Sequence, residues 1–123
     1  MFDLTPEQIR VVATSAVREA KNGGDFVDLV EEQTGIKIRV ISGIEEARLI
    51  FLGVRHSMAL SQKPTLVVDV GGGSTELVRG DASGPQTAVS LDAGAVRFTE
   101  RFLHDDPPSA EQIAALREEV MGM

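Results

Sequence analysis

The sequence predicts an α/β protein, and two observations carry that prediction. Segments with the apolar pattern of strands alternate with segments with the pattern of helices along most of the 123 residues. A run at residues 69–76, Asp-Val-Gly-Gly-Gly-Ser-Thr-Glu, stands between two short apolar segments, Thr65–Val68 and Leu77–Val78. Such a run is typical of the turn of a tight β-hairpin.

The first third of the chain predicts a strand–helix–strand unit. The second of its helices places Phe26, Leu29 and Val30 on one face. Its strands are separated by a long connection, which implies that they pair in parallel. The expected elements are a helical lead from Pro6, a strand over about residues 9–14, a turn and short helix at 15–21, a helix from Asp25 that ends at Gly35, and a strand over 36–41.

The segment from Ser42 to about Met58 is the clearest helix in the sequence. Ser42 and Glu45 form a Ser-x-x-Glu capping box at its start. The helix carries a wide apolar stripe, which indicates burial on more than one side. The stripe consists of Ile44, Ala47, Phe51 and Val54, broadened by Leu49, Ile50 and Leu52.

The remaining residues predict a second sheet followed by two helices. The strand over residues 65–70 is apolar on both faces, so we expect a central strand that is covered on both sides. After it we expect an antiparallel strand at 77–79, a turn at 80–84, a strand at 86–91, a helix at 95–103, a linker at 104–108, and a final helix capped by Ser109 and Gln112.

These elements divide the chain into three parts. Residues 1–41 form the end of a first α/β domain, residues 42–63 are a connecting helix and loop, and residues 64–123 form the start of a second α/β domain. Neither half is large enough to enclose a core of its own. We therefore expect a partial chain of a two-domain protein.

Composition excludes several classes of function. Hydrophobic residues make up 42% and charged residues 25% of the chain, which are ordinary values for a globular protein. A net charge of -7 argues against a nucleic-acid surface, and the absence of cysteine excludes disulfides and thiolate chemistry. No apolar run approaches the length of a membrane helix, and residues 1–5 lack the pattern of a signal peptide, so we expect a cytoplasmic protein.

The glycine-rich run has the composition of a phosphate site. Gly71, Gly72 and Gly73 permit positive φ and the close approach of backbone N–H groups to a ligand, and successive N–H groups form a nest for a phosphate. Ser74 and Thr75 add hydroxyl donors. The flanking acids, Asp69 and Glu76, are suited to a divalent cation or to polarising a water molecule. The alternative is a glycine-rich hairpin with two solvated acids, because a glycine loop alone specifies little.

Four motifs in this order and spacing resemble the exopolyphosphatase/guanosine pentaphosphate phosphohydrolase (Ppx/GppA) family. The match covers roughly residues 9–103, which is most of the chain. The motifs are residues 12–20 (Val-Ala-Thr-Ser-Ala-Val-Arg-Glu-Ala), 41–50 (Ile-Ser-Gly-Ile-Glu-Glu-Ala-Arg-Leu-Ile), 68–77 (Val-Asp-Val-Gly-Gly-Gly-Ser-Thr-Glu-Leu) and 90–102 (Ser-Leu-Asp-Ala-Gly-Ala-Val-Arg-Phe-Thr-Glu-Arg-Phe). The resemblance implies an actin-like, Hsp70-like ATPase (ribonuclease H-like) superfold, of which this chain covers only the end of domain I and the start of domain II.

The resemblance also implies roles for individual residues. Arg18 matches the arginine that grips substrate phosphate, and Glu46, rather than its neighbour Glu45, matches the catalytic base. Asp69 and Glu76 match a metal-binding acid and a second acid that activates water or binds metal. The phosphate cradle corresponds to Gly71, Gly72, Gly73, Ser74 and Thr75. A further motif covers residues 94–97, in which we expect Arg97 to be a packing or ion-pair residue and not a ligand.

The implied reaction is hydrolysis of a phosphoanhydride bond. Its substrate would be polyphosphate or guanosine pentaphosphate, and its cofactor Mg²⁺ or Mn²⁺. Two alternatives remain: an ATP-dependent kinase of the same superfold, and a non-enzymatic fragment that binds phosphate, nucleotide or a partner chain. The family's first phosphate loop does not precede Met1. For the chain alone we therefore expect at most trace hydrolysis, self-association or pairing with missing domain segments, and no binding to DNA or membranes.

Overall fold

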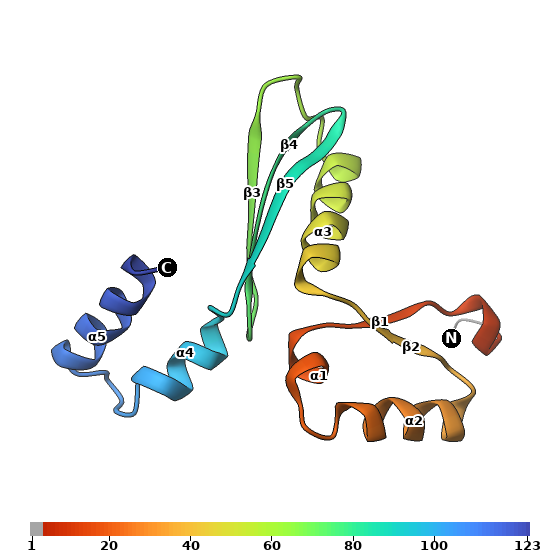
Figure 1. Cartoon of the computed structure of the whole chain (residues 1–123), viewed down its shortest axis with the longest axis horizontal. Coiled ribbons are helices and arrows are strands. Elements are labelled where there is room, and N and C mark those ends of the chain that lie inside the picture. The colour runs from red at the N-terminus through yellow and green to blue at the C-terminus, as the bar shows by residue number, and fades with distance from the viewer. Residues whose placement is uncertain (1–3) are drawn as a thin grey trace.

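The computed structural model describes residues 4–123, which form two small sheets and the helices around them (Figure 1). The two described ends of the chain lie at opposite sides of the molecule. In chain order the elements are η1 (Pro6–Gln8), β1 (Val11–Ala13), α1 (Ser15–Glu19), α2 (Gly23–Thr34), β2 (Ile38–Val40), α3 (Gly43–Ser57), β3 (Thr65–Val70), β4 (Thr75–Asp81), β5 (Gly84–Leu91), α4 (Ala95–Phe102) and α5 (Ala110–Met121).

The first unit confirms the strand–helix–strand prediction. β1 and β2 pair in parallel, with Val12 opposite Arg39. Gly35 ends α2 in the left-handed conformation, at φ 71°, where a side chain would be strained. α2 begins at Gly23, two residues before the predicted start. A Cβ atom at Gly23 would lie 2.2 Å from the Val17 carbonyl oxygen, so glycine permits the tight passage from α1 into α2.

Helix α3 begins as predicted but without the complete capping box. The Ser42 side chain accepts a hydrogen bond from the Glu45 N–H at 3.2 Å, a cap that contributes about 1 kcal/mol. The Glu45 carboxylate, however, pairs with Arg39 Nη2 at 2.7 Å. Glu45 therefore links the start of α3 to β2. The prediction that the Glu45 side chain caps the helix by accepting from the Ser42 N–H is wrong.

The second sheet has the strand order β3-β4-β5, with both pairs antiparallel. Helix α3 packs on one face of this sheet (Figure 1). Ala47 and Phe51 of α3 and Val78 of β4 are completely buried and form the core. A Cβ atom at Gly80 would lie 2.6 Å from the Phe51 ring, so glycine at this position lets the ring reach the sheet. The helix assigned to the connecting part of the chain thus completes the core of the second unit.

Strand β3 differs from its prediction. It lies at the edge of the three-stranded sheet, and its Val67 side chain points toward the core under α3. The alternate residues Leu66, Val68 and Val70 are 61%, 52% and 64% exposed on the opposite face. The prediction of a central strand covered on both sides is therefore wrong for this chain, because no element among residues 4–123 packs on the second face.

The C-terminal helices follow the prediction closely. Ser109 accepts from the Gln112 N–H at 3.2 Å, and the Gln112 side chain accepts from the Ser109 N–H at 3.3 Å, so this capping box is complete. Arg101 of α4 pairs with Glu119 of α5 at 2.8 Å and holds the two helices together. Within residues 4–123, none of the helices has the length and apolar character needed to cross a membrane.

We expect the chain of residues 1–123, studied alone, to self-associate through the exposed face and free edge of β3. Val68→Lys places a charge in the middle of that face and should shift the chain toward monomer in sedimentation velocity at micromolar concentrations. Met121→Lys, at an exposed site on α5, is the matched control and should leave the distribution unchanged. A wild-type chain that stayed monomeric would contradict this expectation.

Candidate functional site

The glycine run forms the turn of the β3–β4 hairpin. Val70 pairs with Thr75, and the Gly71 N–H donates to the Ser74 carbonyl at 2.9 Å. Positive φ occurs within residues 4–123 only at Gly35 and Gly84. The expectation that these three glycines adopt positive φ is therefore wrong, and Gly73 is glycine for another reason.

That reason is space on both sides of the hairpin. A Cβ atom at Gly73 would lie 2.2 Å from Ser15 Oγ of α1. On the other side, a Cβ atom at Gly94 would lie 2.2 Å from the Gly72 carbonyl oxygen. The hairpin is thus held between α1 and the start of α4, as Figure 1 shows.

The first turn of α4 binds the carbonyl groups of the hairpin. The Ala95 N–H donates to the Gly71 carbonyl at 2.9 Å, and the N–H groups of Val96 and Arg97 both donate to the Gly72 carbonyl at 3.0 Å. These bonds replace a side-chain cap, which Gly94 cannot supply. The N–H groups of Gly72 and Gly73 donate no hydrogen bond within the described part of the chain. The hairpin therefore has its carbonyls satisfied and two adjacent N–H groups free, as an anion nest requires.

The two hydroxyl groups of the predicted cradle are less available than the sequence suggests. Thr75 Oγ1 donates to the Ala93 carbonyl, which ties β4 to the segment before α4. Ser74 is 3% exposed. The Ser74 N–H and hydroxyl donate no hydrogen bond within the described residues either, so the free donors of the hairpin are the N–H groups of Gly72, Gly73 and Ser74, together with the buried Ser74 hydroxyl.

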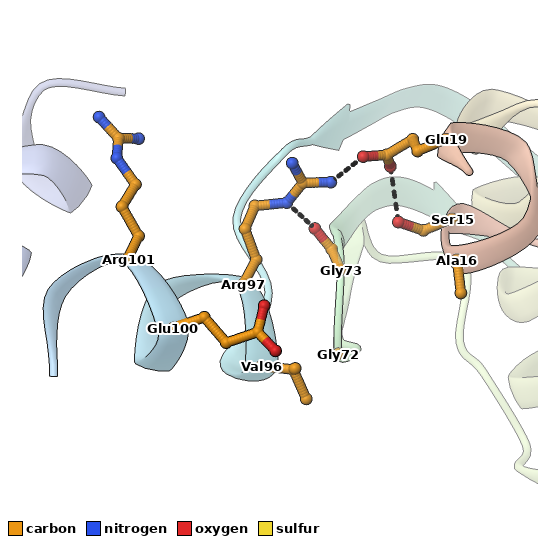
Figure 2. A pocket seen from close by; sticks show the side chains of 9 residues that line it. All are labelled: Ser15, Ala16, Glu19, Gly72, Gly73, Val96, Arg97, Glu100 and Arg101. Carbon is orange, nitrogen blue, oxygen red and sulfur yellow. Dashed lines mark hydrogen bonds and ion pairs between the residues drawn. The ribbon is translucent and has the colours of Figure 1, made fainter. Parts of the chain in front are cut away.

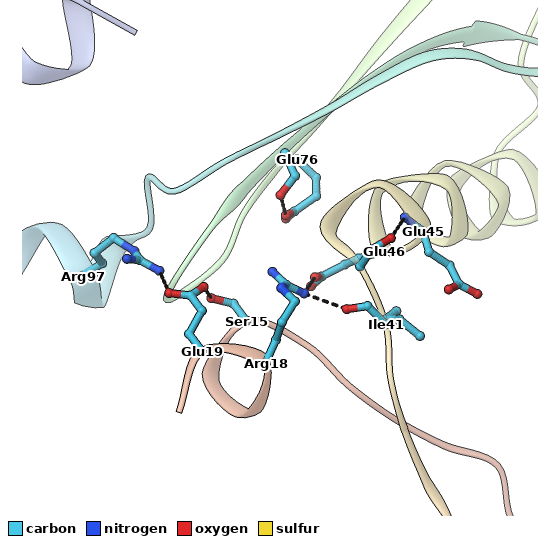
Figure 3. A network of polar contacts seen from close by, with 10 residues as sticks. Ser15, Arg18, Glu19, Ile41, Glu45, Glu46, Glu76 and Arg97 are labelled. Atoms are coloured by element: carbon cyan, nitrogen blue, oxygen red, sulfur yellow. Dashed lines mark hydrogen bonds and ion pairs between the residues drawn. The ribbon is translucent and has the colours of Figure 1, made fainter. Parts of the chain in front are cut away.

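Arg18 and Glu46 meet where the two parallel strands end. β1 leads into α1 and β2 leads toward α3, and the carboxyl ends of parallel strands lie at the same edge of a sheet. Arg18 Nη1 donates to the Ile41 carbonyl at 2.9 Å and to Glu46 Oε2 at 3.3 Å (Figure 3). Within residues 4–123, no hydrogen bond or ion pair joins this pair to the glycine hairpin.

Glu76 is 1% exposed and is held by a residue that sequence reasoning missed. Ser90 of β5 lies directly opposite Glu76 and donates to Glu76 Oε1 at 2.8 Å. A Cβ atom at Gly43 would lie 2.2 Å from Ser90 Oγ and 3.8 Å from Arg18 Nη2. Gly43, one turn before Glu46, therefore brings the start of α3 against the strand pair that holds Glu76.

Asp69 and Glu76 are the two acids suited to a cation. They lie directly opposite each other on β3 and β4, so both side chains project from the same face of the sheet. Like charges in this arrangement repel, and a cation between them would remove the repulsion. Residues 4–123 contain no group of three or more His, Asp and Glu side chains that could hold a metal. The pair nevertheless fits Mg²⁺, which proteins often bind through one or two carboxylates together with substrate phosphates.

A second polar network joins α1, the hairpin and α4 (Figure 2). Ser15 Oγ donates to Glu19 Oε1 at 2.7 Å, and the Glu19 carboxylate also pairs with Arg97. The Ser15 hydroxyl, followed by the Arg97 guanidinium, lowers the pKa of Glu19 below its usual value, and Glu19 raises the pKa of Arg97. Because folding lowers the pKa of Glu19, its ionised carboxylate stabilises the folded state. This contribution is complete at a pH above the usual pKa of glutamate, and it is lost as the pH falls through the lowered pKa of Glu19 in the folded protein.

A cleft of about 530 Å³ opens between α1 and α4 beside this network. Its charged lining consists of two arginines and two glutamates, so the charges cancel, and Arg101 turns away toward Glu119. The cleft thus carries no excess positive charge for an anion. Its lining residues are Ser15, Ala16, Glu19, Gly72, Gly73, Val96, Arg97, Glu100 and Arg101.

The fold and the glycine hairpin place the protein in a structural class. Its solved neighbours have the actin-like ATPase fold, and this chain shares that fold. The structure is similar to that of an exopolyphosphatase-like protein, with a TM-score of 0.86 and 44% identity over 92% of this chain and 37% of that one. It is similar to the Aquifex aeolicus PPX-GPPA enzyme, with a TM-score of 0.72 and 38% identity over 91% of this chain and 37% of that one. The sequence matches the Ppx/GppA phosphatase family over residues 1–123, and the chain belongs to that family.

A curated relative gives the same assignment. The chain is 42% identical over 111 residues to exopolyphosphatase 1 of Mycobacterium leprae (strain TN), which covers 90% of this chain and 33% of the relative. The chain thus spans about a third of the length of that relative. The predicted family and fold class are confirmed, whereas the roles of single residues stay predictions.

Gly73→Ala should destabilise the hairpin, because the new Cβ atom would meet Ser15 Oγ at 2.2 Å. We expect the free energy of unfolding of the full-length protein to fall by about 1–3 kcal/mol in chemical denaturation. Ser15→Ala in the same chain should recover part of the loss. The control is Gly24→Ala in α2, where the new Cβ atom would meet no atom within 4 Å. Because alanine favours the helix more than glycine does, this change should raise the free energy of unfolding by up to about 1 kcal/mol. Equal effects at Gly73 and Gly24 would show that the contact with α1 is unimportant.

Proposed function

We propose that the protein hydrolyses the terminal phosphoanhydride bond of polyphosphate or of guanosine pentaphosphate. One observation carries the proposal: α4 takes the carbonyl groups of the glycine hairpin, so that the N–H groups of Gly72 and Gly73 are free for an anion. The similarity to an exopolyphosphatase and to an exopolyphosphatase-like protein supports polyphosphate as the first substrate to test.

In this proposal Arg18 and the hairpin bind the phosphate. The contacts of Arg18 with Ile41 and Glu46 use only Nη1. Its remaining N–H groups are suited to two parallel hydrogen bonds with phosphate oxygens. The ion pair with Glu46 restricts the guanidinium and reduces the entropy lost when it binds substrate.

Glu46 is the proposed general base. Its side chain is 16% exposed and is oriented by the ion pair with Arg18. A carboxylate at this position would orient the attacking water and accept its proton, while the phosphoryl group leaves the anhydride oxygen. The adjacent Glu45 points to Arg39 and is 41% exposed. In this proposal Glu45 therefore has a structural role, whereas Glu46 has the catalytic one.

Asp69 and Glu76 are proposed to hold a divalent cation, Mg²⁺ or Mn²⁺. When bound, the cation supplies positive charge that offsets the charge on the phosphate oxygens. Ser90 would orient Glu76 for this task, because it donates to one carboxylate oxygen and leaves the other for the metal.

Glu46→Gln in the full-length protein should reduce kcat by about 10²–10⁴-fold, since an amide cannot accept a proton from water. KM should change little, because the amide keeps the size of the side chain and its carbonyl oxygen can still accept the hydrogen bond from Arg18. Phosphate release from polyphosphate with Mg²⁺ and without an acceptor measures the effect and excludes a kinase. Glu45→Gln is the matched control and should retain near wild-type kcat. An active Glu46 variant beside an inactive Glu45 variant would reverse the assignment.

A further inference from the structure

Arg97 joins two parts of the molecule that are far apart in the sequence. It lies in the first turn of α4, and its Nε donates to the Gly73 carbonyl at 2.7 Å. Its Nη2 pairs with the Glu19 carboxylate of α1, as Figure 2 shows. One guanidinium group thus contacts both the glycine hairpin and α1.

Helix α1 is also the helix that carries Arg18. Arg18 immediately precedes Glu19, and Ser15 of the same helix contacts Gly73 and donates to Glu19 at 2.7 Å. α1 has only five residues, so a displacement at Glu19 moves Arg18 as well. The position of Arg18 relative to the hairpin therefore depends on the contacts of Ser15, Glu19 and Arg97.

We propose that Arg97 is a positioning residue that sets the distance between the free N–H groups of the glycine hairpin and Arg18. This inference rests on the function proposed above, in which both groups bind the same phosphate. The planar guanidinium holds its two acceptors in a fixed relative geometry, which the single ammonium group of lysine cannot do. Arg97 itself does not touch the substrate.

The test compares Arg97→Gln, Glu19→Gln and the double variant in the full-length protein, with polyphosphate and Mg²⁺. We expect each single change to reduce kcat/KM by about tenfold or more, because small displacements of binding groups slow the reaction strongly. The double variant should lose little more than either single variant, since both changes break one link. Arg97→Lys should recover only part of the activity.

Arg101→Gln is the matched control. Arg101 lies one turn further along α4 and also pairs with a glutamate, but its partner is Glu119 of α5 and not α1. This variant should keep kcat/KM within about twofold of wild type. Equal losses for Arg97→Gln and Arg101→Gln, or additive losses in the double variant, would overturn the proposal.

A second readout does not depend on activity. Hydrogen exchange of the hydrogen-bonded N–H groups of Gly71, Ala95 and Val96, which join the hairpin to itself and to α4, should become faster in Arg97→Gln and Glu19→Gln and stay unchanged in Arg101→Gln. Unchanged exchange in the first two variants would also overturn the proposal. If the wild-type protein released no phosphate, the proposed function would fail, and the exchange measurement alone would decide whether Arg97 holds the hairpin.

Discussion

The glycine hairpin depends on the hydrogen bonds that it accepts from the first turn of α4. Helix α4 needs acceptors for its first N–H groups, and the hairpin needs donors for its carbonyls. The N–H groups of α4 donate to the carbonyls of the hairpin, so both sets of groups are satisfied. A buried group left without a partner would cost about 1–3 kcal/mol. The arrangement requires a backbone without side chains at Gly73 and Gly94, where Cβ atoms would clash. It also leaves the N–H groups of Gly72 and Gly73 among the free polar groups of the turn.

The other half of the candidate site follows from the parallel strand pair. β1 and β2 end side by side, so the helices that follow them begin at the same place. Arg18 and Glu46 meet there, and Gly43 lets the start of α3 approach Ser90 and hence Glu76. The candidate site is thus assembled at the ends of secondary-structure elements, where short contacts and not a large core determine its geometry.

Local patterns predicted most of the elements and the ends of several helices, because caps such as Ser42 and Gly35 act within one turn. The contact between Glu76 and Ser90 could not be predicted in the same way. Near the turn, Asp81 pairs with Gly84, and that register would place Val89 opposite Glu76; a bulge at Arg79 and Gly80 shifts it by one residue. Such a shift exchanges the two faces of a strand. Likewise, Gly73 serves close packing against Ser15, which no local pattern reveals.

The central claim is that the N–H groups of Gly72 and Gly73 bind substrate phosphate. Selective labelling of glycine nitrogen in the full-length protein allows these N–H groups to be followed by NMR as inorganic phosphate or polyphosphate is added. We predict that the Gly72 and Gly73 signals shift with saturation, whereas Gly24 and Gly53, which lie in helices α2 and α3, do not. Substrate binding that left the Gly72 and Gly73 signals unmoved would contradict the account.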